Sequence, residues 1–166
     1  MQLTRILGLI CDMWQIKSQG LVLKRSNYSE TDKIITLLTK HKGKMTFIAK
    51  GVRRMKSKKR GHLEIFNLID FSAQLRGGSL GYLTEVKTIR GFPKLRQDLK
   101  KMTLAYYFME VVGRVSPPEE ANEHLFGLVG TYLSRLEKTD KLKNLRANFI
   151  NELLVLLGFW PKDKPM

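Results

Sequence analysis

The stretch KIITLLTKHKGKMTFIAK, residues 33–50, holds two apolar runs on either side of a basic tetrad that contains one glycine. Both runs are rich in β-branched and aliphatic residues, and Gly43 stands where the chain must turn tightly, so the stretch predicts a β-hairpin. Three further runs, residues 20–25, 62–75 and 80–89, also read as strands. Five short strands joined by glycine-bearing turns are typical of a small closed or nearly closed barrel.

The hydrophobic period changes from two to about 3.6 after residues 91–93, Gly-Phe-Pro. Apolar residues at three- and four-residue steps predict a helix that begins near Pro93 and ends before Pro117. Two more helices are predicted over residues 119–136 and 141–157. The predicted fold is therefore α+β, with an N-terminal extension (1–14), a five-stranded barrel (15–90) and an all-helical C-terminal domain (91–166).

The charge of the chain is strongly basic and unevenly placed. The 166 residues carry a formal charge of +15, and residues 17–60 hold fourteen lysines and arginines against two acids. Most of the net charge, +12, thus lies in one quarter of a chain whose 43% hydrophobic content is sufficient for a packed core. This balance predicts a polyanionic partner, nucleic acid first and an anionic membrane surface second.

The most basic stretch is IAKGVRRMKSKKRG, residues 48–61, in which Arg53 to Arg60 carry six positive charges and no negative one. Mutually repelling cations bury no apolar surface, so we expect a surface loop that adds nothing to the core and meets phosphate. A solvated charge run is the alternative interpretation. If the barrel binds single strands, rings on its strands would stack on bases, and the candidates are Tyr28, Phe47 and Tyr82. Each ring could instead be a packing residue.

No catalytic or metal-binding pattern is present in the sequence. The single cysteine, Cys11, excludes an internal disulfide, and His41, His62 and His124 are isolated from it and from one another. We therefore expect no enzyme activity, no cofactor and no metal. The apolar run at residues 6–11 is too short to span a membrane and is a poor signal peptide, so a cytoplasmic protein is expected. Met1 and Met13 both stay open as the natural start.

Several motifs occur in an order that resembles one family. They are GLVLK (20–24), YSETDK (28–33), TLLT (36–39), GK (43–44), AKGVRR (49–54), LEIF (63–66), LTE (83–85), FP (92–93), AYY (105–107), LF (125–126) and the run from Phe149 to Phe159. The series covers residues 16 to 161, and the Ala-Lys-Gly-x-Arg-Arg stretch is its most specific part. The chain resembles the RecO family of bacterial recombination mediators.

The resemblance implies an OB-fold barrel and a nucleoid-associated protein that binds single- and double-stranded DNA. It further implies annealing of strands coated with single-strand-binding protein, and joint action with RecR to load RecA. The DNA contacts that it implies are Lys24, Arg25, Lys44, Lys50, Arg53, Arg54, Lys56, Lys58, Lys59 and Arg60. The tail of the single-strand-binding protein would meet Lys94, Arg96, Lys100 and Lys101.

The resemblance departs from the family pattern at the C-terminal end. Many members continue after the Gly-Phe-x-Pro stretch into a four-ligand zinc motif, whereas this sequence stops at Met166. The sequence is either a fragment or a short form, and we expect its helical domain to be incomplete relative to the family. Two other functions stay open: an OB-fold protein that binds RNA, and an interaction module that binds no nucleic acid. Membrane binding is not expected, because no predicted helix opposes a strongly basic face to Trp or Phe.

Overall fold

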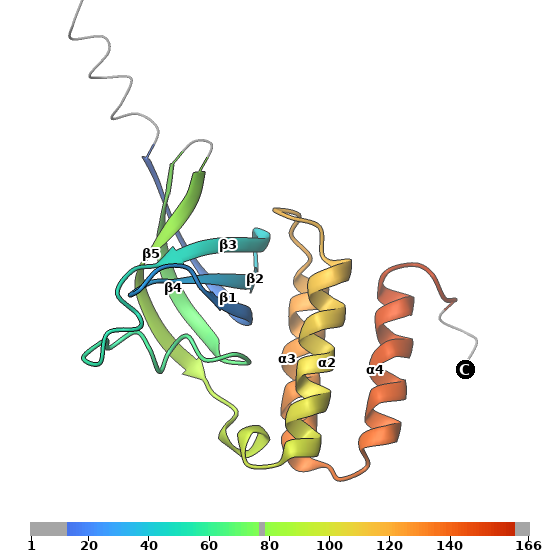
Figure 1. Cartoon of the computed structure of the whole chain (residues 1–166). Helices are drawn as coiled ribbons and strands as arrows, with labels where there is room; N and C mark the ends of the chain where they lie inside the picture. Colours follow the sequence, from blue (N-terminus) through green and yellow to red (C-terminus); the bar gives the residue numbers. More distant parts are fainter. Residues whose placement is uncertain (1–12, 77–78, 162–166) are drawn as a thin grey trace, which may run out of the picture.

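The computed structural model of the chain describes residues 13–76 and 79–161 and has a β-barrel beside a group of helices (Figure 1). The barrel closes in the strand order β1-β2-β3-β5-β4. Its neighbours pair antiparallel except β3 and β5, which pair in parallel. The strands are β1 (Met13–Asn27), β2 (Lys33–Thr39), β3 (Gly43–Ala49), β4 (Leu68–Arg76) and β5 (Ser79–Arg90). This layout confirms the predicted α+β fold class with an OB-type barrel.

Side chains from alternate positions of each strand fill the barrel. On β3, Met45, Phe47 and Ala49 face inward, as the two-residue period of a strand requires. Phe47 is 0% exposed, and its ring lies 5.4 Å from that of Phe71. The prediction that Phe47 stacks on bases is therefore wrong, because the inward face of β3 buries the ring in the core.

Residues 50–67 connect β3 to β4 and form turns instead of a strand or helix. Val52 and Leu63, near the two ends of this segment, are buried in the barrel core. The predicted surface loop thus does contribute to the core, because its apolar ends anchor it while the charged middle stays outside. The strand predicted from residue 62 begins only at Leu68, although the apolar residues before it alternate.

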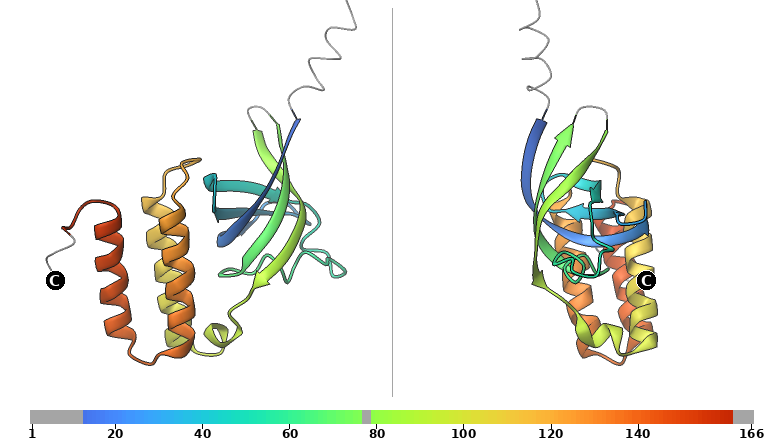
Figure 2. Two further views of the ribbon diagram at one scale, coloured as in Figure 1. Left: turned by 180° about the vertical axis from the view of Figure 1, so that it is seen from behind. Right: turned by 60° about the vertical axis from the view of Figure 1, so that its left-hand side comes forward.

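A short 3-10 helix and three α-helices follow the barrel. They are η1 (Pro93–Arg96), α2 (Leu99–Val115), α3 (Glu123–Lys138) and α4 (Leu142–Leu156). The Asp98 side chain accepts hydrogen bonds from the first backbone amides of α2, and Asn122 does the same for α3. The predicted first helix is therefore split, since Pro93 begins η1 and Asp98 caps a separate helix, α2. Helices α2 and α3 lie beside the barrel, and α4 lies on their far side (Figure 2).

The helices and the barrel share a second hydrophobic core. Phe108, Tyr132 and Phe149 form its aromatic centre, with the rings of Phe108 and Phe149 only 4.0 Å apart. Leu21 and Leu38 enter the same core from the outer face of the barrel. The outer face of β1 and β2 is thus partly covered by helices. No helix among the described residues is long and apolar enough to cross a membrane.

The hairpin between β2 and β3 locks onto the loop between α2 and α3. Gly43 has φ +65°, and a Cβ atom there would collide with the main chain of Glu120, so only glycine fits. The Glu119 amide donates a hydrogen bond to the Lys44 carbonyl oxygen, and His41 Nδ1 lies 2.8 Å from Glu123 Oε1. These contacts fix the helices against the barrel.

Candidate nucleic-acid interface

The turn after β1 holds the start of the basic segment. Asp32 Oδ1 accepts hydrogen bonds from the Gly51 amide and the Thr31 hydroxyl, both at 2.8 Å. The Arg53 amide donates to the Thr31 carbonyl, and the Arg53 guanidinium donates to the Ser29 carbonyl at 2.6 Å. The Gly51 hydrogen bond, followed by that from Thr31, lowers the pKa of Asp32 below its ordinary value. Asp32 therefore stays ionised and keeps the first residues of the loop in place.

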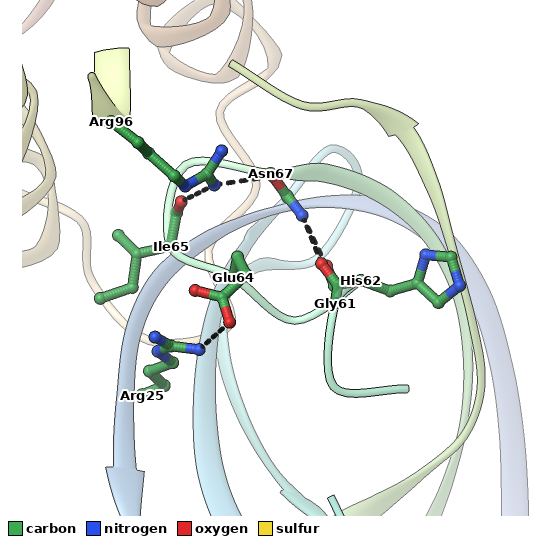
Figure 3. A network of polar contacts seen from close by, with 7 residues as sticks. All are labelled: Arg25, Gly61, His62, Glu64, Ile65, Asn67 and Arg96. Atoms are coloured by element: carbon green, nitrogen blue, oxygen red, sulfur yellow. Dashed lines mark hydrogen bonds and ion pairs between the residues drawn. The ribbon is translucent and has the colours of Figure 1, made fainter. Parts of the chain in front are cut away.

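A polar network holds the other end of the segment (Figure 3). The Arg96 guanidinium reaches back from η1 and donates to the Ile65 carbonyl at 2.7 Å and to Asn67 Oδ1 at 2.9 Å. Asn67 Nδ2 in turn donates to the carbonyl oxygens of Gly61 and His62. The basic loop is thus tied at both ends, so its charges project from a fixed base.

Four cations gather around one acid at this end of the barrel. Burial and then the charge of Arg25 lower the pKa of Lys33, and Arg53 and Arg60 act in the same direction. Glu64 opposes them and is already paired with Arg25 at 2.6 Å. The site is short of negative charge, and a phosphate group would supply it. Lys33 is not among the predicted DNA contacts, because the alternation of residues in its strand does not show that its side chain faces the loop.

Five of the ten predicted DNA contacts already have a partner within the molecule. Arg25 is paired with Glu64, and Arg53 with the turn at Ser29. Lys44 Nζ donates to the Gly113 carbonyl at 2.6 Å, Lys59 Nζ donates to the Leu83 carbonyl at 3.0 Å, and Lys50 Nζ lies 4.3 Å from the centre of the Tyr82 ring. These side chains therefore stabilise the fold through internal contacts, in addition to giving the surface positive charge.

The other five predicted contacts have no side-chain hydrogen bond or ion pair with the part of the chain that the structure describes. All five are exposed, and four of them lie on the basic loop around Met55, which is itself 95% exposed. A cation without an internal partner keeps its full capacity for phosphate. These residues are Lys24, Arg54, Lys56, Lys58 and Arg60.

The two remaining candidate rings differ in their accessibility. Tyr28 is 56% exposed and follows directly after β1, so its ring is open to a base. Tyr82 is half-buried beneath the Lys50 ammonium group. Base stacking stays a prediction for both residues, and Tyr28 is the more accessible.

The four cations predicted to meet a partner's tail do not form one open cluster. Lys94 and Lys100 are exposed, whereas Arg96 belongs to the network at Asn67. Lys101 is 13% exposed and lies 3.0 Å from Asp140. Among the described residues, no group of three or more His, Cys, Asp and Glu side chains is placed to hold a metal ion.

Two family models match the chain in succession. "Recombination protein O N terminal" matches residues 13–92, and "Recombination protein O C terminal" matches residues 96–162. The "DNA repair protein RecO" of Alkaliphilus metalliredigens is 33% identical over 147 residues, which cover 88% of this chain and 59% of the relative. The protein of that name from Dehalococcoides mccartyi is 32% identical over 146 residues, 88% of this chain and 57% of the relative. That from Moorella thermoacetica is 34% identical over 146 residues, 88% of this chain and 54% of the relative. The chain thus spans less than two thirds of the length of these relatives.

Proposed function

The chain belongs to the RecO family of bacterial DNA repair proteins, and on this basis we propose that it is a DNA-binding recombination mediator. In this role it binds single- and double-stranded DNA and anneals complementary strands. It also helps to load RecA on DNA coated with single-strand-binding protein, together with RecR. The proposal extends to this chain what the resemblance implies for the family.

The observation that carries the proposal is the set of exposed, internally unpartnered cations on a loop that is fixed at both ends. Arg54, Lys56, Lys58 and Arg60 are available on that loop, and Lys24 is available on β1 of the barrel. Each cation that neutralises a phosphate releases a condensed counterion, which gives affinity without sequence preference. Such a surface also weakens the repulsion between two polyanionic strands, so complementary strands meet more often.

The predicted contact with the tail of the single-strand-binding protein involves fewer residues than the four expected from the sequence. Lys94 and Lys100 are exposed and available to an acidic tail, whereas Arg96 and Lys101 would first have to leave their internal partners. We therefore propose that the tail of the single-strand-binding protein contacts Lys94 and Lys100, and that Arg96 and Lys101 support this surface.

The test is annealing of two complementary oligonucleotides coated with the cognate single-strand-binding protein, at two salt concentrations. The protein should accelerate annealing, and the acceleration should fall as salt rises. The triple variant Arg54→Ala, Lys56→Ala, Lys58→Ala should lose most of it. The matched control is Lys138→Ala, Lys141→Ala, Lys143→Ala, which removes three exposed charges beside the turn between α3 and α4.

Three outcomes would overturn the proposal. Binding that does not depend on salt would exclude a phosphate-driven contact. If the loop variant and the control variant lost the same amount of annealing activity, the loop would act only through the net charge of the protein. A clear preference for RNA over single-stranded DNA of the same sequence would replace the proposal by an RNA-binding function.

A further inference from the structure

A cleft of about 610 Å³ separates the outer face of the barrel from α2. Thr36 and Thr46, cross-strand neighbours on β2 and β3, line the barrel side, and their hydroxyl oxygens lie 3.4 Å apart. Tyr106 and Arg114 line the side of α2, and Lys24 of β1 lies at the same cleft. The cleft therefore combines hydroxyl groups, an aromatic ring, cations and one carboxylate, that of Glu110.

Tyr106 is the unusual residue of this cleft. It stands four residues after Met102 and three before Met109, so the helix period puts it on the apolar face of α2, yet it is 45% exposed. The buried ring of Phe66 meets it in an edge arrangement, with the centroids 4.9 Å apart and the planes at 68°. This contact holds the Tyr106 ring in one orientation while about half of the residue stays open. A fixed and accessible ring is what a nucleobase needs for stacking.

The charges of the cleft suit a phosphate group. Lys24 is exposed and makes no side-chain hydrogen bond or ion pair with the described part of the chain. Within the described part of the chain, Arg114 is paired only with Glu110 of its own helix, at 2.6 Å, and both side chains are largely exposed. An exposed ion pair of this kind contributes little stability, so Arg114 is available to a phosphate at little cost.

The cleft adjoins the C-terminal end of the segment 50–67, which carries the basic loop. Ile65 lines the cleft, and the neighbouring Glu64 is paired with Arg25 (Figure 3), the residue that follows Lys24 in β1. Both acids at this junction are paired with arginines, Glu64 with Arg25 and Glu110 of the cleft lining with Arg114. We propose that the cleft binds one nucleotide of a single strand, with its base on Tyr106 and its phosphate between Lys24 and Arg114. This inference rests on the proposed function, because it assumes that the loop binds DNA.

The proposal separates single strands from duplex. A base enters the cleft only when it is free of its partner, since paired bases are stacked inside the double helix and present their phosphates outward. Tyr106 therefore contributes to single-strand binding alone, whereas the loop cations contribute to both forms of DNA.

The first test uses a single-stranded oligonucleotide in which thymine is replaced by 5-iodouracil, a base that cross-links to adjacent aromatic rings on irradiation. Peptide mass spectrometry of the irradiated complex should locate an adduct at Tyr106. In parallel, Tyr106→Ala should lower single-strand affinity about tenfold and leave duplex affinity unchanged. Tyr106→Phe should keep the affinity, because it keeps the ring.

If Tyr106→Ala proves to be misfolded, a second pair of variants tests the cleft without removing a packed ring. Lys24→Glu and Arg114→Glu alter exposed side chains and should each weaken single-strand binding, whereas Lys143→Glu on α4 is the matched control. Salt-dependent DNA binding with no adduct at Tyr106 and no effect of these variants would overturn the cleft and leave the proposed function standing. Equal losses on single strands and duplex would also overturn it. Absence of all DNA binding would overturn both proposals.

Discussion

Leu63 and Phe66 are three positions apart, yet their side chains lie in the two different hydrophobic cores of the molecule. Leu63 packs inside the barrel, and Phe66 packs with the helices. The main chain between them makes a tight turn in which Phe66 adopts φ +76° and its amide donates to the Val22 carbonyl at 3.0 Å. The end of the basic loop is thereby anchored in the barrel and in the helical core at once.

Replacement of Phe66 by alanine should destabilise the protein by about 3–5 kcal/mol, because it removes a buried ring and leaves a cavity. Chemical denaturation followed by circular dichroism measures the loss. Ile89→Ala is the control, since Ile89 is 44% exposed, and it should cost less than about 1 kcal/mol. Equal costs for the two variants would contradict the assignment of Phe66 to the shared core.

Replacement of Gly43 by alanine should separate the β2–β3 hairpin from the loop that follows α2. The left-handed backbone and the collision with Glu120 together should cost about 2 kcal/mol or more in the free energy of unfolding. The matched variant is Gly127→Ala on α3, where a Cβ atom meets nothing within 4 Å. It should stabilise the helix by about 0.5–1 kcal/mol. Thermal unfolding of both variants tests whether the first change lowers the stability and the second raises it.

The hydrogen bonds to Asp32 should make part of the stability dependent on acid pH. The folded pKa of Asp32 lies below its ordinary value of 3.8, so its contribution is present above that value. It is lost as the pH falls from there through the folded pKa. Urea titrations between pH 2 and pH 6 should show a shallower acid loss of stability for Asp32→Asn than for the unaltered protein. Parallel curves would show that Asp32 does not hold the loop.

Tyr132 should make part of the stability dependent on alkaline pH, in the opposite direction to Asp32. Burial and then the hydrogen bond to Glu152, 2.6 Å long, raise the pKa of the phenol above its ordinary value of 10.0. Its contribution is present below that value and is lost as the pH rises through the folded pKa. Tyr132→Phe should cost about 1 kcal/mol at neutral pH and should flatten the alkaline loss. An unchanged alkaline curve would contradict the role of this hydrogen bond.

Cations with and without internal partners should separate into two classes. Arg54→Ala and Lys58→Ala should each reduce the slope of log affinity against log salt by about 0.7 for single strands, with no change in stability. Arg53→Ala and Lys59→Ala remove main-chain contacts as well, so they should also lower the unfolding temperature. Salt titrations of binding and thermal unfolding of the four variants measure both effects. Identical behaviour in all four would remove the distinction.

The sequence by itself determined the order and type of most elements. Alternation of apolar residues defined the strands around Gly43, and the three- and four-residue steps after Pro93 defined the helices. These patterns work because a strand or helix imposes its own period on nearest neighbours, whatever lies beyond. The division into an extension, a barrel domain and a helical domain at residues 14/15 and 90/91 stays a prediction. Residues 1–12, 77–78 and 162–166, which include Cys11 and most of the predicted extension, lie outside the described part of the chain.

Only the tertiary structure determines whether a given side chain is buried or exposed and which distant residue it contacts. The alternation at Leu63 and Ile65 resembles a strand, but the chain turns there because Leu63 and Phe66 enter separate cores. Likewise, Phe47 is inside and Tyr106 half outside, although both belong to apolar patterns. Lys44 finds its acceptor at Gly113, sixty-nine residues away. Local periodicity carries no information about such distant contacts, and these contacts determine which cations hold the fold and which are left for phosphate.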